Sequence, residues 1–210
     1  MKGHAGQLAG VVLAAVLAGC SALPDKPVRA TLYDFGPAVG APPATPPTMP
    51  AIVLSEIEAL GALDGSAILY RLGYADDHQL RPYAQARWSA PPPQLVRQRL
   101  RLQLGRDRAV LDLGDSVALA RTGGAVPRIM RIDLEEFSHL FESQTQSWGL
   151  LRLRVTLMEN TPGGEKLLAQ RNFVVRKPAP TPDAPGGVRA LAAATDAAAV
   201  DIAQWLRGMP

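Results

Sequence analysis

The chain has 210 residues, which fits one domain with a tether, and it carries a formal net charge of +3, one cysteine and 5% aromatic residues. A single cysteine excludes an intramolecular disulfide, and it excludes metal sites that are built from several cysteines. The arginines are scattered along the chain instead of forming a basic block, so the charge does not indicate a nucleic-acid partner.

The amino terminus is typical of a cleaved export signal that ends at Cys20. A weakly positive start is followed by the apolar run Leu8 to Leu17, which is too short to span a bilayer. Two small residues then precede Cys20, and the resulting Leu-Ala-Gly-Cys sequence resembles the bacterial lipoprotein signal. We therefore predict a signal peptide at 1–19 and lipidation of Cys20, by fatty acids such as palmitate. An ordinary secretory signal that is cleaved nearby is the alternative.

Acylation of Cys20 would decide where the mature protein resides. Each buried methylene contributes about 0.8 kcal/mol, so two or three acyl chains would hold the protein at a membrane. Residue 21 is a serine. An aspartate at this place would resemble an inner-membrane retention signal of Gram-negative bacteria. We therefore expect the protein at the periplasmic face of the outer membrane.

An uncharged segment rich in proline and alanine, residues 36–50, follows a short strand expected at residues 31–35. Polyproline geometry would extend it by about 3.1 Å per residue, which amounts to roughly 45 Å. The segment is therefore either a spacer between membrane and domain or a long surface loop. If the short strand pairs with the rest of the sheet, the lipidated tether is confined to 20–30 and the domain covers 31–208.

The next part of the chain predicts strands and one helix. We expect strands at residues 51–60, 67–74 and 79–83, with turns at Leu63–Gly65 and Asp76–His78. Three prolines then open a helix at about 92–105, which Ser89 or a neighbour would cap. Its apolar stripe consists of Leu95, Val96, Leu100 and Leu104.

The last part of the chain predicts a sheet that is covered by a carboxy-terminal helix. A half-buried strand is expected at 128–136, and alternating residues at 151–157 and 166–176 indicate a hairpin across a Pro-Gly-Gly turn. An apolar repeat close to 3.6 residues then predicts a helix at about 187–207, after a flexible segment at 181–187. The fold class is therefore α/β, a compact sandwich with a mixed β-sheet flanked by helices.

None of the candidate chemical sites in the sequence indicates catalysis, a metal or a cofactor. The neighbours Asp133, Glu135 and Glu136 lie on a strand that would expose them to solvent, whereas paired-carboxylate catalysis needs partners across a cleft. His78 and His139 lack spaced cysteine or carboxylate partners and are interpreted as surface residues. No phosphate-binding loop, dinucleotide fingerprint or Gly-x-Ser-x-Gly elbow occurs. We therefore expect a protein that is not an enzyme.

Arg87 and Trp88 form the segment most open to a functional interpretation. An aromatic residue with a flanking arginine could form a surface that faces a partner or a lipid headgroup, but we favour a core tryptophan because the flanking prolines need an apolar group to pack on. Tyr70, Tyr74 and Tyr83 are expected to be core or core-edge residues, since strand tyrosines usually bury the ring and hydrogen-bond the hydroxyl.

The order of these segments resembles that of the ABC-type transport auxiliary lipoprotein family, which includes the PqiC/YmbA-like outer-membrane lipoproteins. The motifs that carry the resemblance are the signal ending at Cys20, Leu32-Tyr33-Asp34-Phe35-Gly36-Pro37, Leu63-Asp64-Gly65, Ile68-Leu69-Tyr70-Arg71, Tyr83-Ala84, Arg87-Trp88 and the proline-started helix. The resemblance covers most of the mature chain and is most specific over residues 63–105. The proline-rich stretch after Phe35 is unusually long for the family.

The resemblance implies a non-enzymatic component of an ABC/MCE-type lipid transport system, which docks the transport conduit at the outer membrane. The implied partners are an MCE-domain protein with its permease and ATPase, the membrane itself, and phospholipid. A ring of several copies would suit a conduit. Two alternatives remain: a structural lipoprotein that assists assembly of another outer-membrane complex, and an envelope hydrolase.

Overall fold

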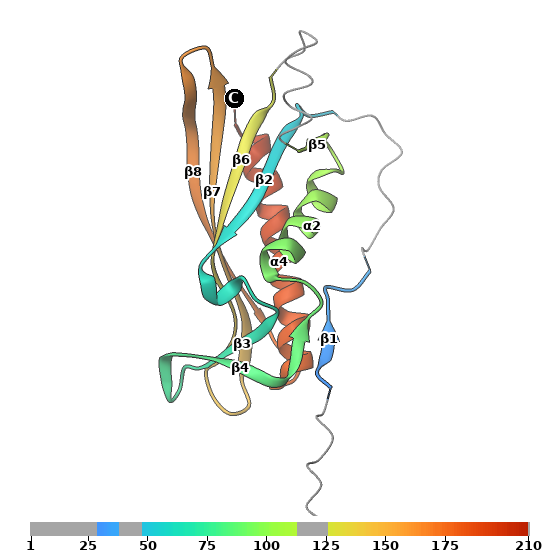
Figure 1. The fold of residues 1–210 in the computed structure, drawn as a ribbon, viewed down its shortest axis with the longest axis vertical. Coiled ribbons are helices and arrows are strands. Elements are labelled where there is room, and N and C mark those ends of the chain that lie inside the picture. Colours follow the sequence, from blue (N-terminus) through green and yellow to red (C-terminus); the bar gives the residue numbers. More distant parts are fainter. Residues whose placement is uncertain (1–28, 38–47, 113–125, 210) are drawn as a thin grey trace, which may run out of the picture.

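The computed structural model describes residues 29–37, 48–112 and 126–209. These residues form a mixed eight-stranded sheet and two α-helices, which lie side by side on one face of it (Figure 1). The predicted α/β fold with a mixed sheet flanked by helices is therefore confirmed. The elements are β1 Thr31–Tyr33, β2 Ile52–Ala59, β3 Ala67–Leu72, β4 Asp76–Trp88, α2 Pro92–Leu104, β5 Val110–Leu111, β6 Arg128–Phe141, β7 Ser147–Thr161, β8 Gly164–Pro178 and α4 Ala184–Arg207.

Strand β6 is the centre of the sheet, and the sheet divides along one of its edges. On that edge, residues 128–134 of β6 pair in parallel with β2, and residues 139–141 pair in parallel with β3. The first branch continues to β5, and the second continues through β4 to β1. The other edge of β6 pairs antiparallel with β7 over its whole length, and β8 follows β7. The sheet therefore has an upper and a lower branch (Figure 1).

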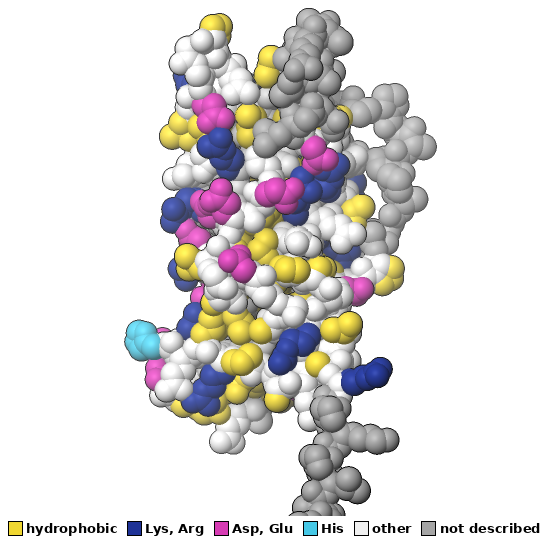
Figure 2. Space-filling model, in the orientation of Figure 1, with side chains coloured by type: hydrophobic (Ala, Val, Ile, Leu, Met, Phe, Trp, Pro, Cys, Tyr) yellow, Lys and Arg dark blue, Asp and Glu magenta, His cyan; other side chains and the backbone are white. Residues whose placement is uncertain are grey.

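The alternation of β7 explains how the sheet packs. Leu151, Leu153 and Val155 are fully buried against the helices, whereas Arg152 and Arg154 between them are exposed. Successive strand residues point to opposite faces, so this pattern buries one face of the sheet. The opposite face carries ion pairs, and both signs of charge are mixed on the side of the molecule shown in Figure 2. The predicted hairpin is confirmed, because β7 and β8 are joined at residues 161–164.

Both predicted helices are present, but their starts differ from the expectation. Helix α2 begins after Pro91, which provides no side-chain cap, so the predicted cap by Ser89 is wrong. Helix α4 begins at 184 instead of 187, because the Asp183 carboxylate accepts a hydrogen bond of 2.8 Å from the Gly186 amide. The residues 184–187 that we expected to be flexible therefore form the first turn of α4.

Two strand predictions are corrected, and the pairing of the first strand is decided. Strand β4 begins at Asp76, and residues 73–75 make the turn that we had expected at 76–78. Strand β6 continues to Phe141, five residues beyond the predicted end. Strand β1 pairs in parallel with β4, so the chain on both sides of residues 38–47 belongs to one sheet. Residues 38–47 themselves lie outside the described residues. Because a strand of the sheet precedes them, the pairing supports the interpretation of the proline-rich segment as a loop within the domain and not as a spacer between membrane and domain.

Candidate functional site

The predicted lipidation site, Cys20, lies outside the described residues, so its acylation stays a prediction. The first described residue, Arg29, precedes β1 at the lower end of the molecule in Figure 1. Residues of β1 and of the first turns of α4, Tyr33 and Val188, line one shallow pocket there. The chain therefore enters the domain at the end where α4 begins.

Trp88 lies in the hydrophobic core. Its side chain is 1% exposed, and its ring packs edge-on against Phe35 and at a tilt against Phe137, each with 5.6 Å between centroids. The preferred interpretation of the sequence, a core tryptophan, is therefore confirmed, and the alternative of a partner-facing or lipid-facing ring is wrong. The Arg87 guanidinium donates to the backbone carbonyls of Tyr83 and Ala86, which holds it along its own strand.

The two glutamates among the acidic neighbours on β6 are held in ion pairs. Glu136 accepts from Arg71 at 3.1 Å, and Glu135 pairs with Arg154 of β7. Glu136 is opposite Arg152 in the pairing of β6 with β7, and Arg152 is exposed on the face of the sheet that is turned away from the helices. The ion pair of Glu136 therefore lies on that face. These carboxylates are committed to arginines, and the arrangement does not present a pair of free acids across a cleft.

The two histidines in the described residues, His78 and His139, have opposite environments. His78 is 95% exposed in its side chain, as predicted. His139 is 0% exposed, so the prediction of a surface residue is wrong. Because β6 continues to Phe141, His139 points toward α4, where the missing side chain of Gly187 makes room for the imidazole. A Cβ at Gly187 would lie 2.5 Å from the Nδ1 atom of His139.

Buried His139 forms a polar pair with the partly buried Tyr83. The Tyr83 hydroxyl lies 2.8 Å from Nδ1 of His139, and Nε2 of His139 is buried without a hydrogen-bond partner. Burial lowers the pKa of His139 to about 4, against the opposing charge of Asp183. Burial, followed by Tyr70 and Asp183, raises the pKa of Tyr83 far above its usual range. Both groups are therefore neutral at pH 7, and neither is suited to proton transfer there.

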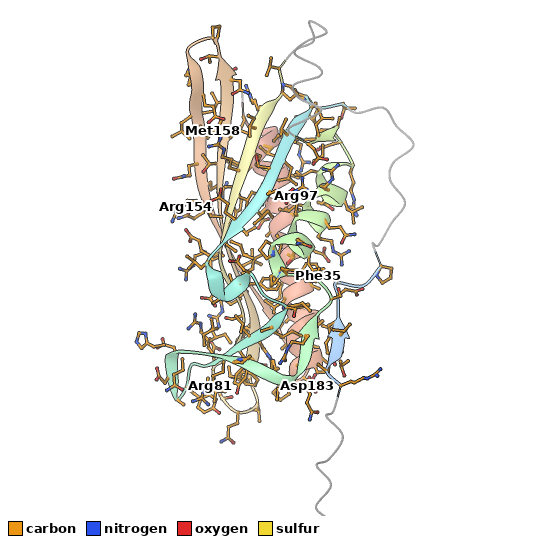
Figure 3. All side chains as sticks on the ribbon, viewed as in Figure 1. Phe35, Arg81, Arg97, Arg154, Met158 and Asp183 are labelled. Carbon is orange, nitrogen blue, oxygen red and sulfur yellow. The ribbon has the colours of Figure 1, made fainter. Side chains whose placement is uncertain are left out.

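Asp183, which is labelled in Figure 3, caps the start of α4, and its charge acts on both Tyr83 and His139. Its carboxylate accepts from the Thr181 hydroxyl at 2.6 Å and from the Gly186 amide, and these hydrogen bonds keep its pKa below the usual range. Tyr83, His139 and the helix cap Asp183 therefore lie close together where β4, β6 and the start of α4 pack against one another. A signal for it exists in the sequence, since Phe137, His139 and Phe141 alternate on one face of a strand.

A cavity lies at the other end of the domain, where β2 and β6 begin and α4 ends. Its volume is about 400 Å³. Buried side chains of Ile52, Leu157 and Leu206 line it, and Val126 and Met209 are less buried lining residues. The upper end of β7, near Met158, marks this level in Figure 3, whereas Asp183 marks the opposite end of α4. The cavity is mainly apolar.

One buried charge belongs to this cavity. Arg108 is 5% exposed and lines it together with Arg128 and Glu159. The Nε atom of Arg108 donates to Asp107 at 3.0 Å, and the other carboxylate oxygen of Asp107 accepts from Arg207 at the end of α4, also at 3.0 Å. The Nη2 atom of Arg108 is buried without a partner. The sequence analysis missed Arg108, because it stands in a short charged stretch that is typical of an exposed turn.

No group of three or more histidine, cysteine, aspartate or glutamate residues in the described ranges is arranged to hold a metal ion. In the same ranges, none of the helices combines the length and the apolar character that a membrane crossing requires.

The sequence of the chain matches the family model of the ABC-type transport auxiliary lipoprotein component over residues 31–203. Protein XCC0632 from Xanthomonas campestris, of family DUF330, has a similar structure with a TM-score of 0.65 and 19% identity, covering 84% of this chain and 94% of that chain. A second crystal structure, of an uncharacterized protein, is similar with a TM-score of 0.62 and 15% identity, covering 85% and 99% of the two chains. These likenesses concern the fold. No curated protein matches the sequence.

Proposed function

We propose, because this chain belongs to the family of ABC-type transport auxiliary lipoprotein components, that it docks the conduit of an MCE-type lipid transport system at the outer membrane. The family match carries the proposal. It extends from β1 to α4, so it includes the whole sheet and both helices. The expected partners are an MCE-domain protein and the permease and ATPase that supply the energy.

The proposed division of the chain places a signal peptide at 1–19, a tether lipidated at Cys20 over 20–30, and one domain over 31–208. The pairing of β1 with β4 supports this division, because it fixes Thr31 to the sheet and leaves only a short tether ahead of it. The tether enters the domain at the end where α4 begins.

The shape of the domain suits a docking role. Helix α4 has 24 residues and is about 36 Å long at 1.5 Å per residue, and it runs from the end where the tether enters to the end with the cavity (Figure 1). An anchor at one end would turn the other end, with the β7–β8 hairpin, into the periplasm. A conduit that arrives from the inner membrane would meet this upper end first.

The polar side chains support a binding role in place of catalysis. The carboxylates Glu135 and Glu136 are paired with arginines, and His139 is closed off by Tyr83 and the start of α4. A group that is neutral, buried and packed on every side has no path to a substrate. The places of these three residues are therefore consistent with a role in binding and positioning.

Site-specific crosslinking in intact cells tests the proposal. A photoreactive amino acid at Leu167, which is 58% exposed on β8 near the hairpin, should capture an MCE-domain protein. The same amino acid at Tyr74, which is 47% exposed at the turn between β3 and β4 in the lower half, serves as the matched control and should capture less. Capture of an outer-membrane barrel or a secretion component from Leu167, without an MCE protein, would favour the assembly alternative and overturn the transport role.

A further inference from the structure

We propose that the cavity at the upper end of the sheet binds one acyl chain of a lipid, and that the anionic group of the same lipid, a phosphate or a carboxylate, pairs with Arg108. The inference deepens the proposed function, and it rests on that function only for the source of the ligand, a lipid that passes through the transport system. The chemistry of the ligand follows from two observations on the cavity itself, its apolar wall and the Nη2 atom of Arg108, which has no hydrogen-bond partner.

The wall of the cavity fits an acyl chain. Ile52, Leu157 and Leu206 are buried and apolar, and the thioether side chains of Met49 and Met209 can adapt to a flexible chain. Its volume of about 400 Å³ lies near the lower end of the range of ligand pockets, which is about 300–1,000 Å³. A cavity of this size accommodates one chain, and a second chain of the same lipid would remain outside.

The charge of the cavity fits an anion. A guanidinium stays ionised in proteins, so the buried Nη2 atom of Arg108 is a charged donor without an acceptor. Asp107 is the acceptor of Arg108 and is shared with Arg207, while Arg128 and Glu159 contribute one charge of each sign. A buried donor that lacks its partner destabilises the protein, and an anionic group at Nη2 would remove that cost.

The occupant is a separate lipid and not the anchor of the protein. The tether enters the domain beside Arg29, at the lower end of Figure 1, whereas the cavity lies at the upper end of α4. The length of α4 separates the two places. The acyl chains expected on Cys20 would be inserted in the membrane on the side away from the cavity.

Photolabelling of the full mature lipoprotein in dodecyl maltoside micelles tests the site. Three probes carry a diazirine in the acyl chain: phosphatidylglycerol, palmitate and diacylglycerol, of which the last has no anionic group. Peptide mapping should find label on the segments that line the cavity, residues 49–52, 126–128 and 206–209, with an anionic probe and not with diacylglycerol. Labelling by phosphatidylglycerol or by palmitate identifies the source of the anionic group.

Two variants and a control decide the roles of the charge and the cavity. Arg108→Gln should reduce the label in the cavity by about tenfold or more, because hydrogen bonds to charged groups are among the strong ones. Met209→Trp should reduce it similarly by filling the cavity, and this variant keeps the buried ion pair, so it decides the matter if Arg108→Gln does not fold. Arg154→Gln, on the opposite face of the sheet, should label as the wild type does.

The inference is overturned if no probe labels the cavity, if diacylglycerol labels it as well as the anionic probes do, or if Met209→Trp leaves the label unchanged. The assay uses the isolated protein. A negative result in this assay therefore removes the lipid site and leaves the crosslinking to an MCE protein in cells as evidence for the transport role. Conversely, a failure of the crosslinking would remove the transport role and leave the labelling of the cavity as evidence for the lipid site.

Discussion

The hydroxyl of Tyr83 on β4 reaches across β3 to lie 2.8 Å from Nδ1 of His139 on β6. The ring of Tyr70, on the strand between them, packs against the ring of Tyr83 with 4.7 Å between centroids. The pair lies beneath the first turn of α4, where Gly187 leaves room for the imidazole. One neutral, partly buried hydrogen bond thus joins β4 to β6 beneath the start of α4.

The stability of the protein should fall as the pH decreases from 6.5 to 4. The pKa of His139 is about 4 in the folded protein and 6.5 ordinarily, so in this interval the unfolded state binds more protons than the folded state. The loss in the free energy of unfolding reaches up to about 3 kcal/mol. Urea denaturation at several pH values measures it. His139→Gln, which does not titrate, should flatten the dependence, and an unchanged slope would contradict the assignment.

Tyr83→Phe should destabilise the protein at pH 7 by about 1–3 kcal/mol, because it leaves the buried Nδ1 of His139 without a partner in addition to Nε2. Tyr74→Phe removes the same atom from an exposed residue and should change the stability by less than about 0.5 kcal/mol. The two variants are compared by urea denaturation. Equal effects would show that the pair does not contribute.

Gly149→Ala should weaken the contact between β7 and α4. A Cβ at Gly149 would lie 2.5 Å from the backbone carbon of Ala190, and backbone cannot move aside as a side chain can. The expected cost is about 1–3 kcal/mol, as for overpacking in cores. Gly163→Ala, at the β7–β8 turn, meets no atom closer than 3.9 Å and is the control. Thermal unfolding with the same midpoint for both variants would contradict the close approach.

Cys20→Ala should abolish incorporation of labelled palmitate and leave an unprocessed precursor at the inner membrane, because the residue that accepts the lipid is gone. Ser21→Asp keeps the cysteine, so it should retain the label and shift the protein to the inner membrane. Labelling and membrane fractionation check both variants. Normal labelling of Cys20→Ala would remove the lipoprotein assignment of this residue.

Local patterns predicted much of the fold. The alternation of leucine, valine and arginine in β7 and the apolar repeat of α4 depend only on neighbours in sequence, so these elements were recognisable. Boundaries were less accurate, since the cap by Asp183 and the extension of β6 to Phe141 depend on hydrogen bonds and pairings with other segments.

The sequence by itself indicated the α/β class and the family resemblance, and it predicts the export signal with Cys20, because these patterns lie in consecutive residues. Only the tertiary structure decided which polar residues are buried. His139 stands after a run of strand residues and Arg108 in a charged stretch, and neither context indicates burial. Distant parts of the chain pack against both residues: Gly187 lies above the imidazole, and Arg207 shares with the guanidinium the carboxylate of Asp107, the neighbour of Arg108 in sequence. Burial depends on packing between segments, so only the folded protein shows the neutral pair of Tyr83 and His139 and the cavity that Arg108 lines.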